Sequence, residues 1–163
     1  MEEDKYRTVN AIAEGLYKEK GSRFISFIYP VKSEEEIKDI VTRLKTKFYD
    51  ARHHCYAYCL GANRANDDGE PSSTAGKPIL GQIISNDLSN VLIVVIRYFG
   101  GIKLGVSGLI QAYKEAAADA INHAEIVERT VDEVIHVRFT YVVMNDVMKV
   151  LKEEEPDILS RNF

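Results

Sequence analysis

An apolar run from Val91 to Ile96 most constrains the fold of this chain. Its residues, Val-Leu-Ile-Val-Val-Ile, are almost all β-branched, and no polar or turn-forming residue interrupts them. A short continuous run of this kind is typical of a strand buried at the centre of a sheet. A glycine-rich segment follows as far as Gly108, and the Ala-rich sequence Leu109–His123 then favours a helix. The sequence therefore predicts a buried strand, a loop and a helix in succession.

The residues before this run predict a mixture of strands and helices. Residues 6–14 and 22–31 are β-rich and predict an antiparallel pair, with Gly15 or Gly21 available for its turn. Ser33 is a suitable N-cap for a helix whose apolar stripe comprises Ile37, Ile40, Val41, Leu44 and Phe48. Further along we expect a strand over residues 53–60, a long polar loop over 61–78 and a short helix over 79–85. This order predicts an α+β protein.

The last part of the chain predicts an incomplete unit. Residues 131–143 are typical of a strand, residues 146–155 of a helix, and residues 158–163 of the beginning of another element. A strand, a helix and part of a strand cannot close a core by themselves. We expect either a shortened second domain or a chain that stops within one, joined to the first domain at residues 125–130.

Composition narrows the class of protein. The chain has 163 residues, 45% of them hydrophobic, which is enough for one ordinary core. A formal net charge of −4 does not indicate a globally basic nucleic-acid binder, so any basic patch must be made by folding. No apolar run approaches the roughly 18 residues of a membrane span, and the charged start differs from a signal peptide. These features predict a cytoplasmic protein.

The two cysteines, Cys55 and Cys59, lie on one face of a predicted strand. Four strand residues separate their Cα atoms by roughly 13 Å, whereas a disulfide needs about 7 Å or less. We therefore expect buried, reduced thiols.

The polar segment Asp67–Pro78 is the first candidate functional loop. Its carboxylates, Asp67, Asp68 and Glu70, suit a divalent ion, but Asp, Gly and Pro are also ordinary turn residues. The turn is the favoured interpretation, and we assign no metal. The hydroxyl groups in the loop are available to bind loop backbone or to cap the next helix, and they belong to Ser72, Ser73 and Thr74.

The segment Arg97–Gly108 is the second candidate loop. Glycines between a buried strand and a helix let the backbone approach a ligand, and the N–H groups that begin a helix favour an anion. The alternative is that the glycines only permit a tight turn and close packing. Neither a nucleotide-triphosphate loop nor a dinucleotide fingerprint is present. The candidate anion-binding residues are Arg97, Gly100, Gly101, Lys103, Gly105, Ser107, Gly108 and, from the first loop, Lys77.

Basic and aromatic residues near these loops complete the candidate surface. His53 and His54 point to opposite faces of their strand, so they cannot chelate one ion together. Six cations flank the loops and form either a local positive patch or scattered, solvated surface charge. They are Lys20, Arg23, Arg52, Lys77, Arg97 and Lys103. Tyr98 and Phe99 can supply stacking surfaces or pack in the core. No nucleophile elbow or catalytic triad is visible.

Several segments resemble the YigZ/IMPACT family. The two longest are Asp67-Asp-Gly-Glu-Pro-Ser-Ser-Thr-Ala-Gly-Lys-Pro-Ile-Leu80 and Val95-Ile-Arg-Tyr-Phe-Gly-Gly-Ile-Lys-Leu-Gly-Val-Ser-Gly-Leu109, although Ser107 stands where the family usually has glycine. Shorter matches occur at residues 20–24, 50–55 and 109–113. The similarity covers roughly residues 5–125 at motif level.

The resemblance implies a fold and a domain plan. The first domain, residues 1–127, would have a four-stranded sheet backed by two helices with a left-handed βαβ crossover, as in ribosomal-protein and elongation-factor domains. Residues 131–163 would be an incomplete ferredoxin-like domain.

The resemblance also implies a function. Eukaryotic members bind proteins and alter translation initiation, and the fold of bacterial members suggests nucleic-acid or ribosome binding. We therefore expect a non-enzymatic cytoplasmic protein of translation regulation that binds RNA, the ribosome or a translation factor through residues 67–78 and 97–108. The alternatives are an enzyme acting on a small phosphorylated or acyl substrate and a pure protein-interaction module. No cofactor, catalytic residue, membrane partner or oligomeric state is assigned.

Overall fold

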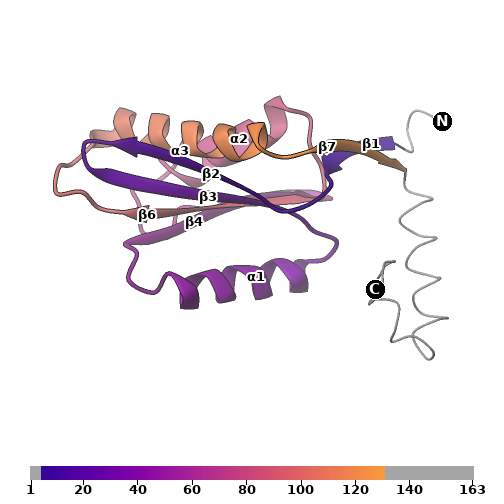
Figure 1. Cartoon of the computed structure of the whole chain (residues 1–163), viewed down its shortest axis with the longest axis horizontal. Coiled ribbons are helices and arrows are strands. Elements are labelled where there is room, and N and C mark those ends of the chain that lie inside the picture. Colours follow the sequence, from indigo (N-terminus) through magenta and orange to yellow (C-terminus); the bar gives the residue numbers. More distant parts are fainter. Residues whose placement is uncertain (1–4, 131–163) are drawn as a thin grey trace. The chain divides into compact units, whose positions relative to one another are not determined.

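The computed structural model describes residues 5–130, and residues 7–127 form one compact unit. Ten elements follow one another along the chain (Figure 1). They are β1 (Lys5–Val9), β2 (Ala13–Glu19), β3 (Ser22–Pro30), α1 (Glu34–Lys47), β4 (His53–Leu60), β5 (Ala62–Asn66), α2 (Gly76–Ser85), β6 (Val91–Tyr98), α3 (Gly105–Asn122) and β7 (Ile126–Thr130). The α+β class expected from the sequence is confirmed.

The main sheet has five antiparallel strands in the order β2-β3-β6-β4-β5, and β1 and β7 form a separate two-stranded sheet. The apolar run of β6 is central, as predicted. Val91, Ile93 and Val95 face the cluster built with α2 and α3, whereas the alternate residues of β6 face the cluster built with α1. Figure 1 shows α1 on one side of the sheet and α2 with α3 on the other. Both faces of β6 are therefore buried.

The sheet has one strand more than expected. Residues 62–66, predicted as part of a long loop, form β5, which pairs with β4 through a tight turn at Gly61, where φ is +77°. All five residues of β5 are exposed, so the strand has no apolar alternation that would reveal it in the sequence. Helices lie on both faces of the sheet.

The connection between β3 and β4 is a crossover. Both strands pair antiparallel with β6, which lies between them, so they run parallel to each other and α1 links them across one face. The left-handed sense implied by the family resemblance stays a prediction. Ser33 caps α1 as expected, because its hydroxyl oxygen accepts a hydrogen bond from the Glu36 N–H at 3.1 Å.

The predicted first hairpin was wrong in one strand. β3 pairs with residues 13–19 through a turn at Lys20 and Gly21, so only the last two residues of the predicted strand 6–14 take part. Gly15 lies within β2 instead of at a turn. A Cβ atom there would overlap with the backbone nitrogen of Ala120 in α3, so this glycine permits the close approach of helix and strand.

Other expectations have mixed outcomes. The helix predicted from Leu109 begins four residues earlier, at Gly105, and α2 begins at Gly76. Cys55 and Cys59 are buried and unbridged, as predicted. Within residues 5–130, none of the helices combines the length and apolar character that crossing a membrane requires. The strand and helix predicted beyond Thr130, and with them the second domain, lie outside the described residues.

Candidate functional site

Asp67 holds the first loop. Its carboxylate caps the N-terminus of α2, although Asp67 lies nine residues before Gly76 in the sequence. It accepts hydrogen bonds from the backbone N–H groups of Ser73 at 2.9 Å, Ala75 at 3.2 Å and Gly76 at 2.8 Å. The N-cap residue Ala75 has no side-chain bond of its own. Burial alone would raise the pKa of Asp67, but these three donors outweigh it and the pKa is lowered. Asp67 therefore organises the loop.

Asp68 attaches the same loop to β4. Its carboxylate accepts a hydrogen bond from the backbone N–H of His54 at 2.7 Å, and its carbonyl oxygen lies 2.7 Å from Nδ1 of His53. A carbonyl oxygen can only accept, so Nδ1 of His53 donates this bond. The two histidines point to opposite faces, as predicted, because the ring of His54 bonds instead to the carbonyl of Phe48 beyond α1.

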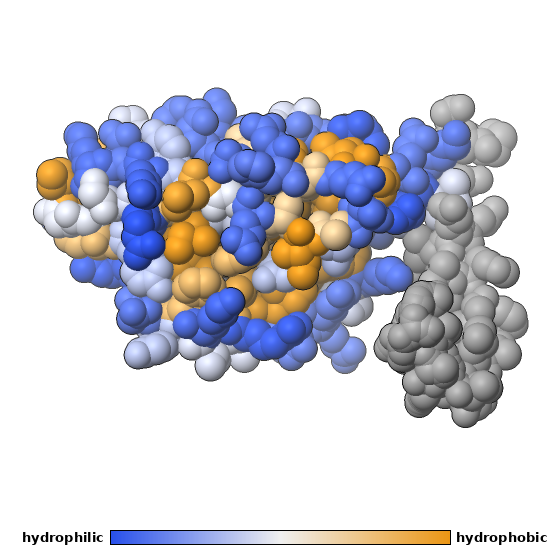
Figure 2. Space-filling view, in the orientation of Figure 1, coloured by the Kyte–Doolittle hydropathy of each residue, from blue (hydrophilic) through white to orange (hydrophobic). Residues whose placement is uncertain are grey.

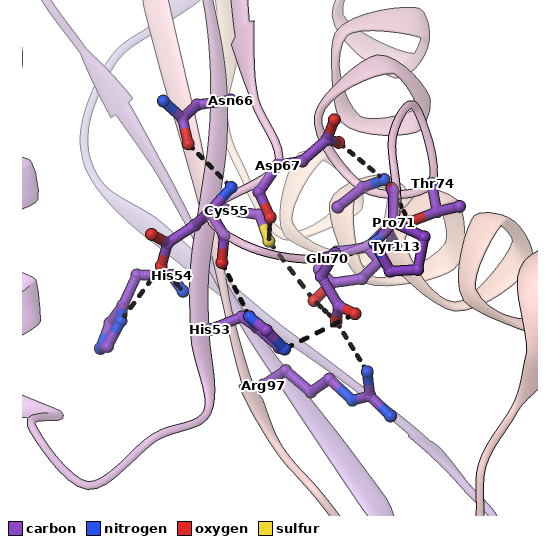
Figure 3. A network of polar contacts seen from close by, with 12 residues as sticks. His53, His54, Cys55, Asn66, Asp67, Glu70, Pro71, Thr74, Arg97 and Tyr113 are labelled. Carbon is purple, nitrogen blue, oxygen red and sulfur yellow. Dashed lines mark hydrogen bonds and ion pairs between the residues drawn. The ribbon is translucent and has the colours of Figure 1, made fainter.

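Glu70 occupies the centre of a buried polar network (Figure 3). Its carboxylate forms an ion pair with Arg97, with 2.7 Å between Oε2 and Nη1, and it also accepts a hydrogen bond from the Tyr113 hydroxyl. Nε2 of His53 lies 3.6 Å from the other carboxylate oxygen. Three elements, β4, β6 and α3, thus converge on a single loop carboxylate. Glu70, expected on the loop surface, is only 7% exposed.

Tyr113 and Cys55 extend this network. The Cys55 thiol lies 3.1 Å from the carbonyl oxygen of Asp67 and 3.4 Å from the Tyr113 hydroxyl. Burial raises the pKa of Tyr113, and the neighbouring Cys55 and Glu70 raise it further. Burial likewise raises the pKa of Cys55. Both groups are therefore neutral at physiological pH, so Tyr113 keeps the proton that it donates to Glu70.

The hydroxyl groups of the first loop have structural roles or face solvent. Thr74 is buried, and its hydroxyl donates to the carbonyl of Pro71 at 2.6 Å. Ser73 has a φ of +66°, a backbone conformation held by its bond to Asp67. Ser72 is exposed. His54 and Thr74, both expected on the loop surface, are therefore buried instead.

The second loop begins against the β2–β3 turn. The N–H of Gly100 donates to the hydroxyl of Ser22 at 3.0 Å, and a Cβ atom on Gly100 would overlap with the carbonyl carbon of Gly21. Gly101 and Gly105 have positive φ angles of +95° and +78°. These glycines therefore allow backbone conformations and a close backbone contact that other residues would not permit. Lys103, Ser107 and the first turn of α3 are exposed, and Gly108 is half-buried.

Cationic side chains gather where this loop lies. Figure 1 shows the β2–β3 turn, the α1–β4 connection and the β6–α3 loop at the same end of the main sheet. Three exposed cations lie on these connections, namely Lys20, Arg52 and Lys103, and Arg23 follows the first connection as the second residue of β3. We call these four residues the basic end. None of the four forms an ion pair with another residue in the part of the chain that the structure describes. The fold thus brings four of the cations expected to flank the loops to one end of the sheet, and their role as a binding patch stays a prediction.

Aromatic rings support two of these cations. The guanidinium of Arg23 lies over the ring of Tyr98, and that of Arg52 lies over the ring of Phe99, each 4.7 Å from the ring centroid. Arg97 also lies 5.6 Å from the centroids of Phe99 and Phe24. These distances lie within the range of cation–π attraction. Carboxylates also lie in this region: Asp50 accepts a hydrogen bond from the Tyr98 hydroxyl, and Glu19 ends β2 directly before Lys20.

The two candidate loops meet through one ion pair. Glu70 of the first loop and Arg97 of the second bond directly, and this contact is buried. Arg97, expected to bind an anion, is only 6% exposed, so its guanidinium mainly serves the network. Lys77 lies exposed on α2, and no described contact joins it to the second loop. The basic end lies beside the second loop and draws no cation from the first.

Sequence reasoning missed Tyr113 as a member of the network. The residue lies on the apolar face of an Ala-rich helix, where a side chain with a polar tip needs a buried partner. A tyrosine on the apolar face of a helix is therefore the feature of the sequence that could have indicated a buried hydrogen-bond partner. Among residues 5–130, no group of three or more His, Cys, Asp or Glu side chains is arranged to hold a metal ion.

A family model and a curated relative identify the same family. The family model described as Impact N-terminal domain matches residues 20–121. The IMPACT family member YvyE of Bacillus subtilis strain 168 is 38% identical over 154 residues, which cover 92% of this chain and 71% of that protein. The solved structure of a hypothetical protein has a TM-score of 0.75 at 28% identity and covers 87% of this chain and 77% of its own. The solved structure of the two-domain translational regulator Yih1 has a TM-score of 0.42 at 27% identity. That match covers 72% of this chain and 47% of the Yih1 chain.

Proposed function

This chain belongs to the IMPACT family, and on that premise we propose that it is a cytoplasmic, non-enzymatic regulator of translation that binds RNA on the ribosome. The proposed contact surface is the basic end, together with the residues of the second loop beside it. Translation enters the proposal from the family resemblance and from the description of Yih1 as a translational regulator.

The observation that carries the proposal is the set of unpaired cations at the basic end. All four are exposed, and none is neutralised by a described carboxylate within ion-pair distance. The whole chain is acidic, with a net charge of −4, so this concentration of positive charge is local. A local patch of one sign attracts a partner of the opposite sign, and phosphate groups of RNA are such a partner.

The first loop supports this surface from within. Its Glu70 holds Arg97 at the end of β6, and Arg97 is followed directly by Tyr98 and Phe99, on which two arginines of the basic end stack. The loop is thereby a structural brace, and the contact with RNA belongs to the second loop.

The enzymatic alternative has less support. A metal or an acid–base mechanism would use the carboxylates of Asp67, Asp68 and Glu70. These groups accept hydrogen bonds from the backbone of their own loop, from the His54 N–H and from Arg97 with Tyr113, respectively. Such bonds leave the carboxylates committed to holding the fold.

A protein-interaction module is the second candidate, and a specific observation favours it. Large apolar side chains are exposed on the second loop and the first turn of α3, with Phe99 at 37%, Ile102 at 54% and Val106 at 59% exposure. In Figure 2 apolar residues are visible at the end of the sheet where this loop lies. Exposed apolar side chains that lie together are a common mark of protein contact.

Co-sedimentation with purified ribosomes tests the first proposal. We expect Arg52→Ala and Lys103→Ala to weaken binding and to make the remaining binding less dependent on salt, because each removes a phosphate contact. Two controls match them in charge and exposure. Arg64→Ala changes an exposed arginine of β5, and Lys38→Ala changes an exposed lysine of α1, so neither should alter binding.

The same assay separates the two candidates. Binding that does not respond to salt, or that the controls reduce as much as the test variants do, would count against RNA contact at the basic end. Retention of a bound factor after nuclease treatment, lost on Ile102→Ser but not on Arg52→Ala, would support the protein-interaction module instead.

A further inference from the structure

At the end of β6, two arginines lie over aromatic rings. Arg52 lies over Phe99 and Arg23 lies over Tyr98, and these two rings are neighbours in the chain at the point where the strand ends. A guanidinium stacked on a ring has one flat face covered and one face open. Arg23 and Arg52 are both exposed, so solvent reaches part of each side chain.

Contacts of the neighbouring residues hold the chain around Phe99, the residue over which Arg52 lies. Phe99 contacts Arg97, which is fixed by its buried pair with Glu70. Directly after Phe99, the backbone of Gly100 is held against the β2–β3 turn by its bond to Ser22. The chain is therefore held just before and just after Phe99, and Arg52 lies over the ring between these two contacts. A preorganised surface loses little freedom when a ligand binds to it.

From this geometry we infer that the basic end binds single-stranded RNA, with an unpaired base stacked on the Arg52–Phe99 pair. The inference rests on the proposed function and specifies the form of RNA. Unpaired bases stack on aromatic rings and on arginine planes, whereas a duplex hides its base faces in its own stack. Lys20 and Lys103 supply point charges for the adjacent phosphates.

Charge alone does not account for the arrangement. Lysine would serve equally for phosphates, and it would not need a ring beneath it. Both arginines of the basic end lie over rings at 4.7 Å, while the two lysines do not stack on any ring among residues 5–130. A partner that offers flat faces as well as negative charge uses both properties, and a single-stranded nucleic acid has both.

Fluorescence anisotropy with the full chain tests the inference. The probes are a fluorescein-labelled single-stranded RNA of about 15 nucleotides, within the usual site range, and a fully paired duplex of the same length. We expect the single strand to bind at least about tenfold more tightly than the duplex, and Arg52→Lys to remove about tenfold from single-strand binding alone, the size of one stacking contact. Arg64→Lys is the matched control and should change neither affinity.

A second variant guards against a folding artefact. Phe99→Leu keeps an apolar side chain but removes the ring, and it should reproduce the effect of Arg52→Lys. If Phe99→Leu shifts the urea midpoint, the exposed Arg52→Lys variant alone decides the question. Equal affinity for single strand and duplex, or wild-type binding by Arg52→Lys, would overturn the inference.

Three further results bear on this inference and on the proposed function. Ribosome co-sedimentation that depends on Lys103 but tolerates Arg52→Lys, without any preference for the single strand, would leave the proposed function standing and remove the inference. Loss of both RNA binding and co-sedimentation in the unmutated chain would remove both. Polyglutamate that competes as well as unlabelled single-stranded RNA would assign the surface to acidic proteins.

Discussion

At the scale of single residues, the ion pair between Glu70 and Arg97 decides how the two family motifs contact each other. Removing two charges from water costs several kcal/mol per ion, so a pair this deeply buried needs further hydrogen bonds. Glu70 receives one from Tyr113, a residue whose pKa is raised by burial and which therefore stays protonated. Arg97 retains one buried nitrogen, Nε, without a partner. The Glu70 carboxylate therefore has more of its hydrogen-bonding capacity satisfied than the Arg97 guanidinium has.

The variant Glu70→Gln should destabilise the protein by about 3 kcal/mol, because it leaves the buried Arg97 without a counter-charge. Urea unfolding followed by circular dichroism measures the change. Glu14→Gln is the control, since Glu14 is exposed on β2 and should shift stability by less than about 0.5 kcal/mol.

A double variant distinguishes the lone charge from other damage. Combining Glu70→Gln with Arg97→Met removes both charges, and it should recover much of the lost stability. An unchanged urea midpoint in the single variant would mean that the pair contributes nothing to folding.

At the scale of elements, close backbone contacts set the position of the second loop. Gly100 lies against Gly21, so the β6–α3 loop and the β2–β3 turn pack without side chains between them. This contact places Phe99 and the adjacent cations at one end of the sheet. Gly81 provides a contrast, because it lies exposed within α2 and a Cβ atom there would meet nothing within 4 Å.

The two glycines should respond to alanine with opposite signs. Gly100→Ala forces one backbone segment away from another and should cost about 2 kcal/mol, as other overpacked sites do. Gly81→Ala should add up to about 1 kcal/mol, because alanine favours the helix. Urea midpoints for both variants check this, and a destabilising Gly81→Ala or a neutral Gly100→Ala would contradict the packing described.

At the scale of the whole molecule, residues 5–130 contain both apolar clusters. One lies between the sheet and α2 with α3, and the other lies between the sheet and α1. A unit with buried apolar residues on both faces of its sheet has the core that independent folding requires. The assignment of residues 131–163 to a second, ferredoxin-like domain stays a prediction.

A chain shortened to residues 5–130 should therefore unfold in a single cooperative transition, as small single domains do. Differential scanning calorimetry of the shortened and full chains checks this, and the calorimetric and van't Hoff enthalpies of the shortened chain should agree. A shortened chain that lacks a cooperative transition would show that the remaining residues are needed for folding.

The sequence by itself determined the elements whose signals are local. The central strand follows from one uninterrupted apolar run, and α1 follows from its cap and its stripe of buried residues. The free cysteines follow from strand spacing, and the family follows from two motifs. Each of these depends on residues that are close together in the chain, so the pattern can be seen before folding.

Only the tertiary structure decided which residues of the motifs face solvent. Glu70 and Arg97 are 27 positions apart, and Glu70 and Tyr113 are 43 apart, so no local pattern indicates that these residues are partners. The role of Gly15 depends in the same way on Ala120, a neighbour from a distant segment. The pairing of β3 and β4 with β6 likewise brings Arg23 and Arg52 to one end of the sheet. Burial and charge clustering arise from contacts between distant segments, and chain order alone does not specify those contacts.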